Sequence, residues 1–398
     1  MRQSKSVADK FLSRAEQLLM QLLALPGKSG EEKQVMDFIT RRLRQAGLPQ
    51  QAMCFDSAHR RSPYGGQVGN LILRLPGSIK APRRMLVAHV DTVPLCQGAR
   101  PVRRGAWIVP ADNRTALGAD DRAGAAVLLA TALEIVNRRL PHPPLVLLWT
   151  VQEELGLYGA RNVAVGRLGK PRWAFNFDGS SPEKVTIGAT GGYRMHITVH
   201  GKASHAGNAP EAGVNAIVIA ARAILRLHAE GWHGRVEKDG RTGTSNVGVI
   251  RGGDATNVVT PLVELRAEAR SHDPEFRQQI VDRYHQYFRE AADAVRSSTG
   301  IAGRVAIKGQ LDYESFRLAD DEPAVLAAEA AIRHAGGQPQ RAISDGGLDA
   351  NWLTAHGIPT VSLGCGQEDA HTAGERLNLE KFRMACKIAL SLATAAVG

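Results

Sequence analysis

Acidic and imidazole side chains occur in short motifs spread over the chain, each where an apolar, strand-like run ends or a helix pattern begins. They are His89, Asp91, Asp120, Glu153, Glu154, Asp178 and His371. A carboxylate or imidazole at the end of a core strand is costly to bury alone, and a shared pair of cations would neutralise the group. Two aspartates, one glutamate and two neutral histidines would set three negative charges against the four positive charges of two divalent ions. The sequence therefore predicts a site for two metal ions.

The first motif pairs a histidine with an aspartate. His89 and Asp91 are two residues apart in an apolar run, so both side chains lie on the same face of a strand. His89 could bind a metal through one ring nitrogen while Asp91 accepts a hydrogen bond from the other, which fixes the tautomer. A core histidine that is simply satisfied by a neighbouring aspartate is an equally good interpretation of this pair alone.

Two other motifs contain adjacent carboxylates. Asp120 and Asp121 stand where a helix pattern begins, and capping or an interaction with the helix dipole is the commoner role of aspartate there. Glu153 and Glu154 end a buried strand, where extended geometry would send them to opposite faces. Only a turn of the backbone would make them converge, and one could then bind metal while the other accepts a proton. The spacing does not assign these two roles.

The elements that must position these residues alternate between helices and apolar strands. Helix patterns occupy 11–23, 29–47, 121–138, 322–334, 348–356 and 379–396, and strand patterns occupy 70–75, 85–90, 145–151, 173–177 and 360–363. The second helix carries a capping-box spacing at Ser29 and Glu32. This alternation predicts an α/β sheet covered on both faces. Asp178 and His371 follow two of its strands, and loops beyond strand ends are where such sheets assemble sites.

The pattern changes near Thr190, where strands alternate polar with apolar residues and pair with two helix patterns, 215–227 and 275–295. This pattern predicts an α+β layer in which one face of the sheet is not covered by helices. A separate domain inserted into the first is the simplest account. The expected organisation is a catalytic domain of 1–189 and 312–398, interrupted by an inserted domain of 190–311.

Composition narrows the class of protein. The chain has 398 residues, 43% of them hydrophobic, and a formal net charge of +11. A basic surface attracts anions, but the basic residues are scattered and aromatic residues make up only 5%, which argues against nucleic acid as a partner. No apolar stretch reaches the roughly 20 residues that a bilayer requires, so we expect no membrane span. The cysteines, at positions 54, 96, 365 and 386, are far apart, which is typical of free thiols in the cytoplasm.

The motifs together resemble a known family. They are HVDTVP from His89, GADDRAG from Gly118, EELG from Glu153, FDG from Phe177, GKASHAG from Gly201 and HTAGE from His371. Their order and content are similar to the co-catalytic zinc peptidases, which include peptidase T, the carboxypeptidase G type enzymes and the aminoacylases. The resemblance covers nearly the whole chain, and GADDRAG with TVQEE is most similar to the peptidase T branch.

The resemblance implies a phosphorylase/hydrolase-like α/β zinc peptidase domain with an inserted α+β lid that also forms a dimer contact. It implies one role for each metal-site residue: Asp120 bridges two metals, His89 and Asp178 hold one, Glu154 and His371 hold the other, Asp91 supports His89, and Glu153 is the general base. It further implies that His205 of the lid stabilises the oxyanion across the dimer. Arg270, with Asn257, would hold a substrate carboxylate. Judged by their own surroundings, His205 would be an exposed loop histidine and Arg270 a surface charge.

The expected function is hydrolysis of short peptides by a cytoplasmic, homodimeric enzyme with two divalent ions, as in an aminotripeptidase or dipeptidase. Zinc is the expected metal, although cobalt or manganese would also suit imidazole and carboxylate ligands. The same site could instead serve an N-acyl-amino-acid deacylase or a carboxypeptidase. A non-catalytic module that binds anions or nucleic acid through its basic surface is the alternative outside enzymes.

Overall fold

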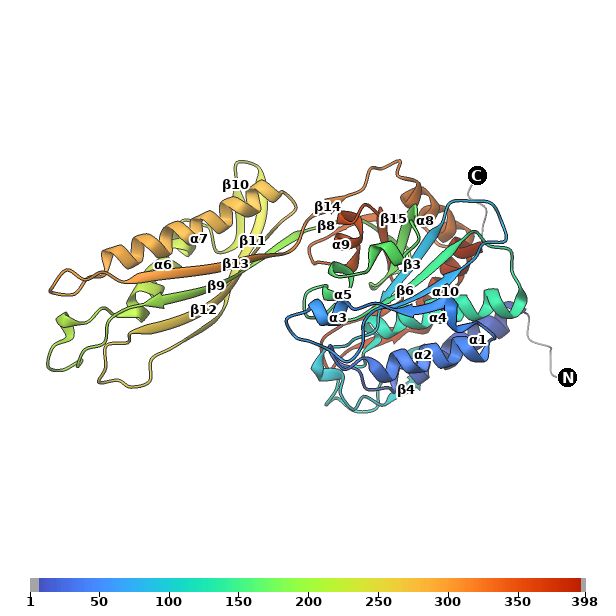
Figure 1. Ribbon diagram of the computed structural model, residues 1–398, viewed down its shortest axis with the longest axis horizontal. Helices are drawn as coiled ribbons and strands as arrows, with labels where there is room; N and C mark the ends of the chain where they lie inside the picture. Colours follow the sequence, from blue (N-terminus) through green and yellow to red (C-terminus); the bar gives the residue numbers. More distant parts are fainter. Residues whose placement is uncertain (1–6, 395–398) are drawn as a thin grey trace. The chain divides into compact units, whose positions relative to one another are not determined.

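The computed structural model describes residues 7–394, which form two compact units. The first comprises the described residues up to Ala189 together with those from Arg317 onward, and the second is Thr190–Phe316 (Figure 1). Strand β13, Arg304–Tyr313, pairs with β9 of the second unit and continues past residue 311, where the sequence placed the end of the inserted domain. Each unit has its own sheet and its own core.

The first unit is built on a mixed sheet whose centre is parallel. The order is β1 (Met53–Phe55), β2 (Leu71–Leu75), β6 (Leu145–Thr150), β3 (Arg84–His89), β7 (Trp173–Phe177), β16 (Thr360–Leu363), β8 (Lys184–Ala189) and β14 (Phe316–Arg317), with β15 (Gln340–Ser344) also beside β8. The neighbours β6, β3, β7 and β16 are mutually parallel. Their carboxyl ends therefore lie at one edge of the sheet.

Helices cover both faces of this sheet, as the sequence predicts. Along β6, Leu148 belongs to a buried cluster with Ala160 of α5 and Leu353 of α9, whereas the indole of Trp149 donates to the Ala125 carbonyl of α4. Successive side chains of a strand point to opposite faces, so α4 and the α5–α9 pair lie on opposite sides. The helices of this unit are α1 (Val7–Leu23), α2 (Lys33–Gln45), α3 (Ala58–Arg61), α4 (Ala119–Arg138), α5 (Tyr158–Arg161), α8 (Pro323–His334), α9 (Asp349–Ala355) and α10 (Leu379–Thr394).

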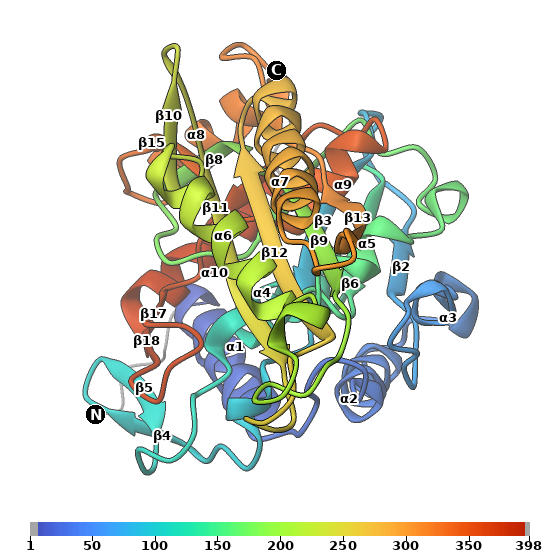
Figure 2. The ribbon, with the colours of Figure 1, turned by 90° about the vertical axis from the view of Figure 1, so that its left-hand side faces the viewer.

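The second unit has an antiparallel sheet with helices on one face only, which confirms the predicted α+β layer. Its order is β10 (Gly234–Lys238), β11 (Arg241–Gly252), β12 (Leu262–Ser271), β9 (Gly191–His200) and β13. Helices α6 (Ala216–Ala229) and α7 (Pro274–Ala294) lie in front of β12 in Figure 2. Along β9, Met195 and Ile197 are buried in the core that these helices share, while Arg194 and His196 are exposed on the other face.

The interactions at the start of α2 differ from those that the spacing predicts. The prediction of a capping box at Ser29 and Glu32 is wrong, because α2 begins at Lys33 without a side-chain cap. The Ser29 hydroxyl donates to Asp91, and the Glu32 carboxylate accepts from the backbone N–H groups of Gly30 and Gln152. Both side chains thus serve tertiary contacts. The last predicted helix extended to residue 396, of which 395 and 396 lie outside the described residues.

A small separate sheet lies in the first unit and was not predicted. It has the order β17 (Gln367–Glu368), β18 (Arg376–Asn378), β5 (Trp107–Pro110) and β4 (Pro101–Arg104). The strands β17 and β18 flank the loop that carries His371, and β18 pairs with β5 at Leu377 and Ile108. Within residues 7–394, no helix is long and apolar enough to cross a bilayer.

Candidate metal centre

The parallel strands deliver acidic and imidazole side chains to one edge of the sheet. His89 ends β3, Glu153 and Glu154 follow β6, and Asp178 follows β7. These strands are direct neighbours, so residues that are far apart in the sequence become adjacent. Asp120 joins them from the first turn of α4, and His371 joins them from the loop between β17 and β18. The structure thus brings together every metal-site residue that the sequence singled out.

Asp120 lies between two histidines. Its Oδ1 is 3.3 Å from His89 Nε2, and its Oδ2 is 3.4 Å from His371 Nε2. Oε1 of Glu154 lies 2.9 Å from the same His371 nitrogen. One carboxylate therefore presents a separate oxygen to each imidazole, which is the arrangement that a ligand bridging two cations requires. Ligand atoms of His89, Asp120 and Glu154 all lie within 4.8 Å of one another, as do those of His89, Asp121 and Asp178.

Asp121 belongs to this cluster, although its position in the sequence did not indicate a role in the site. It is fully buried, and its two oxygens accept from the backbone N–H groups of Gly124, at 2.9 Å, and His89, at 3.3 Å. The first contact resembles that of a helix cap. Capping was expected of Asp120 instead, but the side chain of Asp120 faces the two histidines. The peptide bond between the two aspartates is cis. Gly124 permits this packing, because a Cβ there would lie 2.0 Å from the Phe177 carbonyl oxygen.

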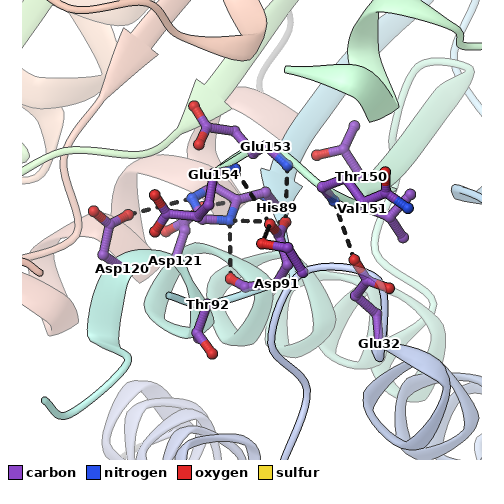
Figure 3. Close-up of polar contacts among 12 residues, drawn as sticks. Glu32, His89, Asp91, Thr92, Asp120, Asp121, Thr150, Val151, Glu153 and Glu154 are labelled. Atoms are coloured by element: carbon purple, nitrogen blue, oxygen red, sulfur yellow. Dashed lines mark hydrogen bonds and ion pairs between the residues drawn. The ribbon is translucent and has the colours of Figure 1, made fainter. Parts of the chain in front are cut away.

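Asp91 is buried beneath His89 and collects several donors (Figure 3). Its carboxylate accepts from the Ser29 hydroxyl at 2.6 Å and from the backbone N–H groups of Glu153 at 3.0 Å and Glu154 at 3.2 Å. Nδ1 of His89 lies 3.4 Å from Asp91 Oδ1 and 3.1 Å from its carbonyl oxygen. Both acceptors favour a proton on Nδ1, which leaves Nε2 free to bind a metal.

The turn that makes the two glutamates converge is present after β6. Gln152 has a left-handed backbone, with φ of 54°. The N–H of Gln152 donates to Glu32 Oε1 at 3.2 Å, and the next two N–H groups donate to Asp91. Buried carboxylates thus hold three consecutive amides of the turn. The Glu154 carboxylate meets His371, whereas that of Glu153 has no hydrogen-bond or ion-pair partner among residues 7–394.

The crowding of acids perturbs their proton affinities. Burial raises the pKa of Asp178 to about 8, and the neighbouring Asp120 charge adds to the effect. Burial also raises the pKa of Glu153 well above its usual range. Hydrogen bonds with Asp120 and Glu154 raise the pKa of His371 to about 10. Burial acts to raise the pKa of Asp120, but its hydrogen bonds with His371 and His89 outweigh it and lower the pKa. Divalent ions would displace the protons that these groups hold, since metal ligands must be deprotonated.

Several supporting residues escaped the sequence analysis because only the tertiary structure reveals their partners. Besides Ser29 and Glu32, Asp349 at the start of α9 is buried and accepts from the Thr150 hydroxyl at 2.5 Å. Glu375 is also buried and contacts the segment that carries Asp120. The one available signal was for Glu375, which is the last residue of the HTAGE motif.

The residues expected in the lid lie in the second unit. His205 is exposed, and its Nδ1 accepts from the N–H groups of Gly207 and Asn208, each at 3.1 Å. A neutral ring in this arrangement carries its hydrogen on Nε2 and can donate it. The Asn257 carbonyl accepts from the N–H of Ala206, so the two loops lie side by side.

Arg270 differs from His205 because its guanidinium already has a partner. It is half-buried and makes two hydrogen bonds to the Glu268 carboxylate, both of 3.0 Å. An incoming carboxylate would have to share Arg270 with Glu268 or displace it.

Comparison with known proteins finds similarity to peptidases in both units. A family model described as a peptidase dimerisation domain matches residues 187–296, and one described as peptidase family M28 matches residues 70–211. The uncharacterised protein YqjE of Bacillus subtilis is 33% identical over 322 residues, which are 80% of this chain and 82% of that protein.

Solved structures extend the similarity over almost the entire chain. A tripeptidase from Staphylococcus aureus superposes with a TM-score of 0.85 and 29% identity, covering 96% of this chain and 98% of its own. The aminopeptidase PepT from Bacillus cereus superposes with a TM-score of 0.82, also with 29% identity and the same coverage.

Proposed function

Because the chain belongs to the co-catalytic zinc peptidase superfamily, in its peptidase T-like branch, we propose that it removes the N-terminal residue from short peptides, tripeptides in particular. The observation that carries this proposal is the position of Asp120, which presents one oxygen to His89 and the other to His371. A carboxylate shared between two imidazoles in this way fits hydrolysis at a pair of metals. It would serve no evident purpose in a protein that only binds anions through its surface.

The donor set suits divalent metal ions. We propose that His89, Asp178 and Asp120 hold one ion and that Glu154, His371 and Asp120 hold the other. When bound, such a pair lowers the pKa of a water molecule towards ~7 and polarises the scissile carbonyl. We propose zinc as the physiological ion, because imidazole and carboxylate are ligands that zinc accepts readily.

Glu153 is the proposed general base. Asp91 fixes its backbone N–H, while its carboxylate is not engaged by any other residue of the described chain and can therefore take a proton. It would accept the proton of the attacking water and deliver it to the nitrogen of the leaving amine. The Asp91 carboxylate already accepts several hydrogen bonds, so its role is to orient His89 and the turn of the two glutamates.

The lid would complete the site. We propose that the unit Thr190–Phe316 forms the homodimer contact and that Nε2–H of His205 stabilises the oxyanion in the other protomer. Arg270 and Asn257 would hold the substrate carboxylate, with Arg270 leaving or sharing Glu268. A guanidinium binds a carboxylate through two parallel hydrogen bonds, and its pair with Glu268 uses that geometry already. All the cysteines are free, which supports a cytoplasmic location.

A panel of di-, tri- and tetrapeptides, each tested with a free or a blocked end, checks the proposed specificity. The metal-loaded enzyme should cleave tripeptides that have a free N-terminus and should lose activity on addition of a chelator. Peptides with an acetylated N-terminus should be poor substrates. Faster cleavage of N-acetylated amino acids than of tripeptides would contradict the proposal and assign the site to a deacylase.

A further inference from the structure

Glu375 is a buried carboxylate with an unusual set of partners. It is 1% exposed and lies four residues after His371, in the loop between β17 and β18. Its Oε2 accepts from the backbone N–H groups of Leu117, at 2.8 Å, and Gly118, at 2.7 Å, and its Oε1 accepts from that of Asp120, at 3.0 Å. All three donors belong to the segment that places Asp120.

These contacts account for most of the backbone donors of that segment. A buried N–H without an acceptor is costly, and residues 117–120 precede the regular part of α4, where intrahelical acceptors are missing. The carboxylate supplies both oxygens to them, so Glu375 has little capacity left to bind a metal itself. Its contribution to the site must therefore come from the backbone segment whose N–H groups it binds.

The backbone of Gly118 makes the arrangement possible. Its φ of 76° lies in the left-handed region, and a Cβ at this position would come within 3.2 Å of Thr92 Cγ2. A left-handed residue in a turn lets successive N–H groups point towards one anion, as in backbone anion nests. Here the anion is a side chain of the loop that also carries a proposed metal ligand.

We propose that Glu375 is a positioning residue that holds Asp120 in its bridging orientation and ties it to the loop of His371. This inference rests on the proposed two-metal function. Asp120 would bind both ions, so a shift of its backbone would weaken the binding of both ions at once. His371 would move with the same loop, since only three residues separate it from Glu375.

The substitution Glu375→Gln tests this role with almost no change in volume. The amide keeps one acceptor oxygen but turns N–H donors towards the backbone N–H groups, so at least one of the three contacts is lost. Outer residues that orient metal ligands typically contribute about 10–100-fold to metal affinity. We expect a loss of that size in the binding of both zinc ions, measured by competition with a chromophoric chelator in the absence of substrate. We also expect kcat to fall at saturating zinc while KM changes little.

Glu368→Gln is the matched control. Glu368 lies in the same region of the chain, but its carboxylate pairs with the side chains of Arg376 and Lys381 rather than with the segment that carries Asp120. Its loss should leave zinc affinity unchanged. A purely structural role for Glu375 would lower the melting temperature of the metal-free protein without changing zinc affinity, and that result would overturn the proposal.

A measurement on the wild-type protein does not depend on whether the variant folds. Hydrogen exchange of metal-free enzyme should show slow exchange at Leu117, Gly118 and Asp120, because Glu375 holds these amides without any ion. Fast exchange there would refute the inference even if the enzyme cleaves peptides. Conversely, zinc affinity that depends on Glu375 in a protein that cleaves no peptide would leave the inference intact and contradict only the proposed function.

Discussion

His371 and Glu154 are 217 positions apart in the sequence, yet Nε2 of the histidine lies 2.9 Å from Oε1 of the glutamate. The contact joins the loop between β17 and β18 to the turn after β6. Glu154 is nearly buried, with a side chain that is 8% exposed, whereas that of His371 is 52% exposed. A metal bound by this pair would therefore be open to water on the histidine side and enclosed on the glutamate side.

Replacement of Glu154 should remove one of the two metals. In Glu154→Gln the side chain keeps its size but loses its charge, and His371 with Asp120 would remain as the only donors for that ion. We expect about one zinc per chain by atomic absorption after dialysis, and a kcat lower by about 10²-fold or more, because one of the two cations of the site is missing. Two tightly held ions in this variant would show that Glu154 is not a ligand.

Replacement of Glu153 should separate catalysis from metal binding. Its carboxylate has no partner in residues 7–394, so Glu153→Gln should leave the ligand geometry unchanged. Since general-base catalysis contributes typically 10²–10⁴-fold, we expect kcat on a tripeptide to fall by about that factor. The zinc content should equal that of the wild type. Retained turnover would exclude Glu153 as the base.

His205 should affect the chemical step rather than substrate binding. Loss of one oxyanion donor typically lowers kcat by about 10²–10³-fold. We expect His205→Ala to show such a drop with a nearly unchanged KM in steady-state kinetics. His228→Ala is the control, because His228 is an exposed histidine on α6 of the same unit. Equal kcat values for the two variants would contradict the proposed role of His205.

Gly124 should be required for stability. Its Cβ position lies 2.0 Å from the Phe177 carbonyl oxygen and 2.5 Å from Asp121 Oδ2, so Gly124→Ala must push α4 away from β7. Overpacking of this kind typically costs about 1–3 kcal/mol, which thermal unfolding of the metal-free protein would measure. Gly166→Ala provides the comparison, because among residues 7–394 no atom beyond its own chain neighbours lies within 4 Å of its Cβ position. An unchanged melting temperature for Gly124→Ala would mean that helix and strand are packed less closely than described.

Much of the site could be predicted because its residues follow strands with a clear apolar pattern. His89 ends β3, Asp91 lies two residues beyond it, and Asp178 follows β7, so their proximity follows from the order of a parallel sheet. The positions of the adjacent glutamates were harder to predict, because their convergence depends on the left-handed backbone of Gln152. Glutamine is not a residue type that indicates such a turn.

The supporting residues could not be predicted because their partners are distant in sequence. Ser29 and Glu32 have the spacing of a capping box. In the folded chain, however, Glu32 accepts a hydrogen bond from the N–H of Gln152, 120 residues away, and Ser29 donates one to Asp91, 62 residues away. Local spacing cannot reveal that a tertiary acceptor competes for a side chain. The short strands β17 and β18 have too few residues to show any periodicity, although they frame His371.

The proposed function depends above all on Asp120 bridging two ions within one site. A crystal of the zinc-loaded protein, measured at wavelengths on either side of the zinc absorption edge, tests this most directly. We expect two anomalous peaks about 3.5–4 Å apart, one beside Oδ1 of Asp120 and His89 and the other beside Oδ2 and His371. A single peak, or two peaks that do not share Asp120, would contradict it.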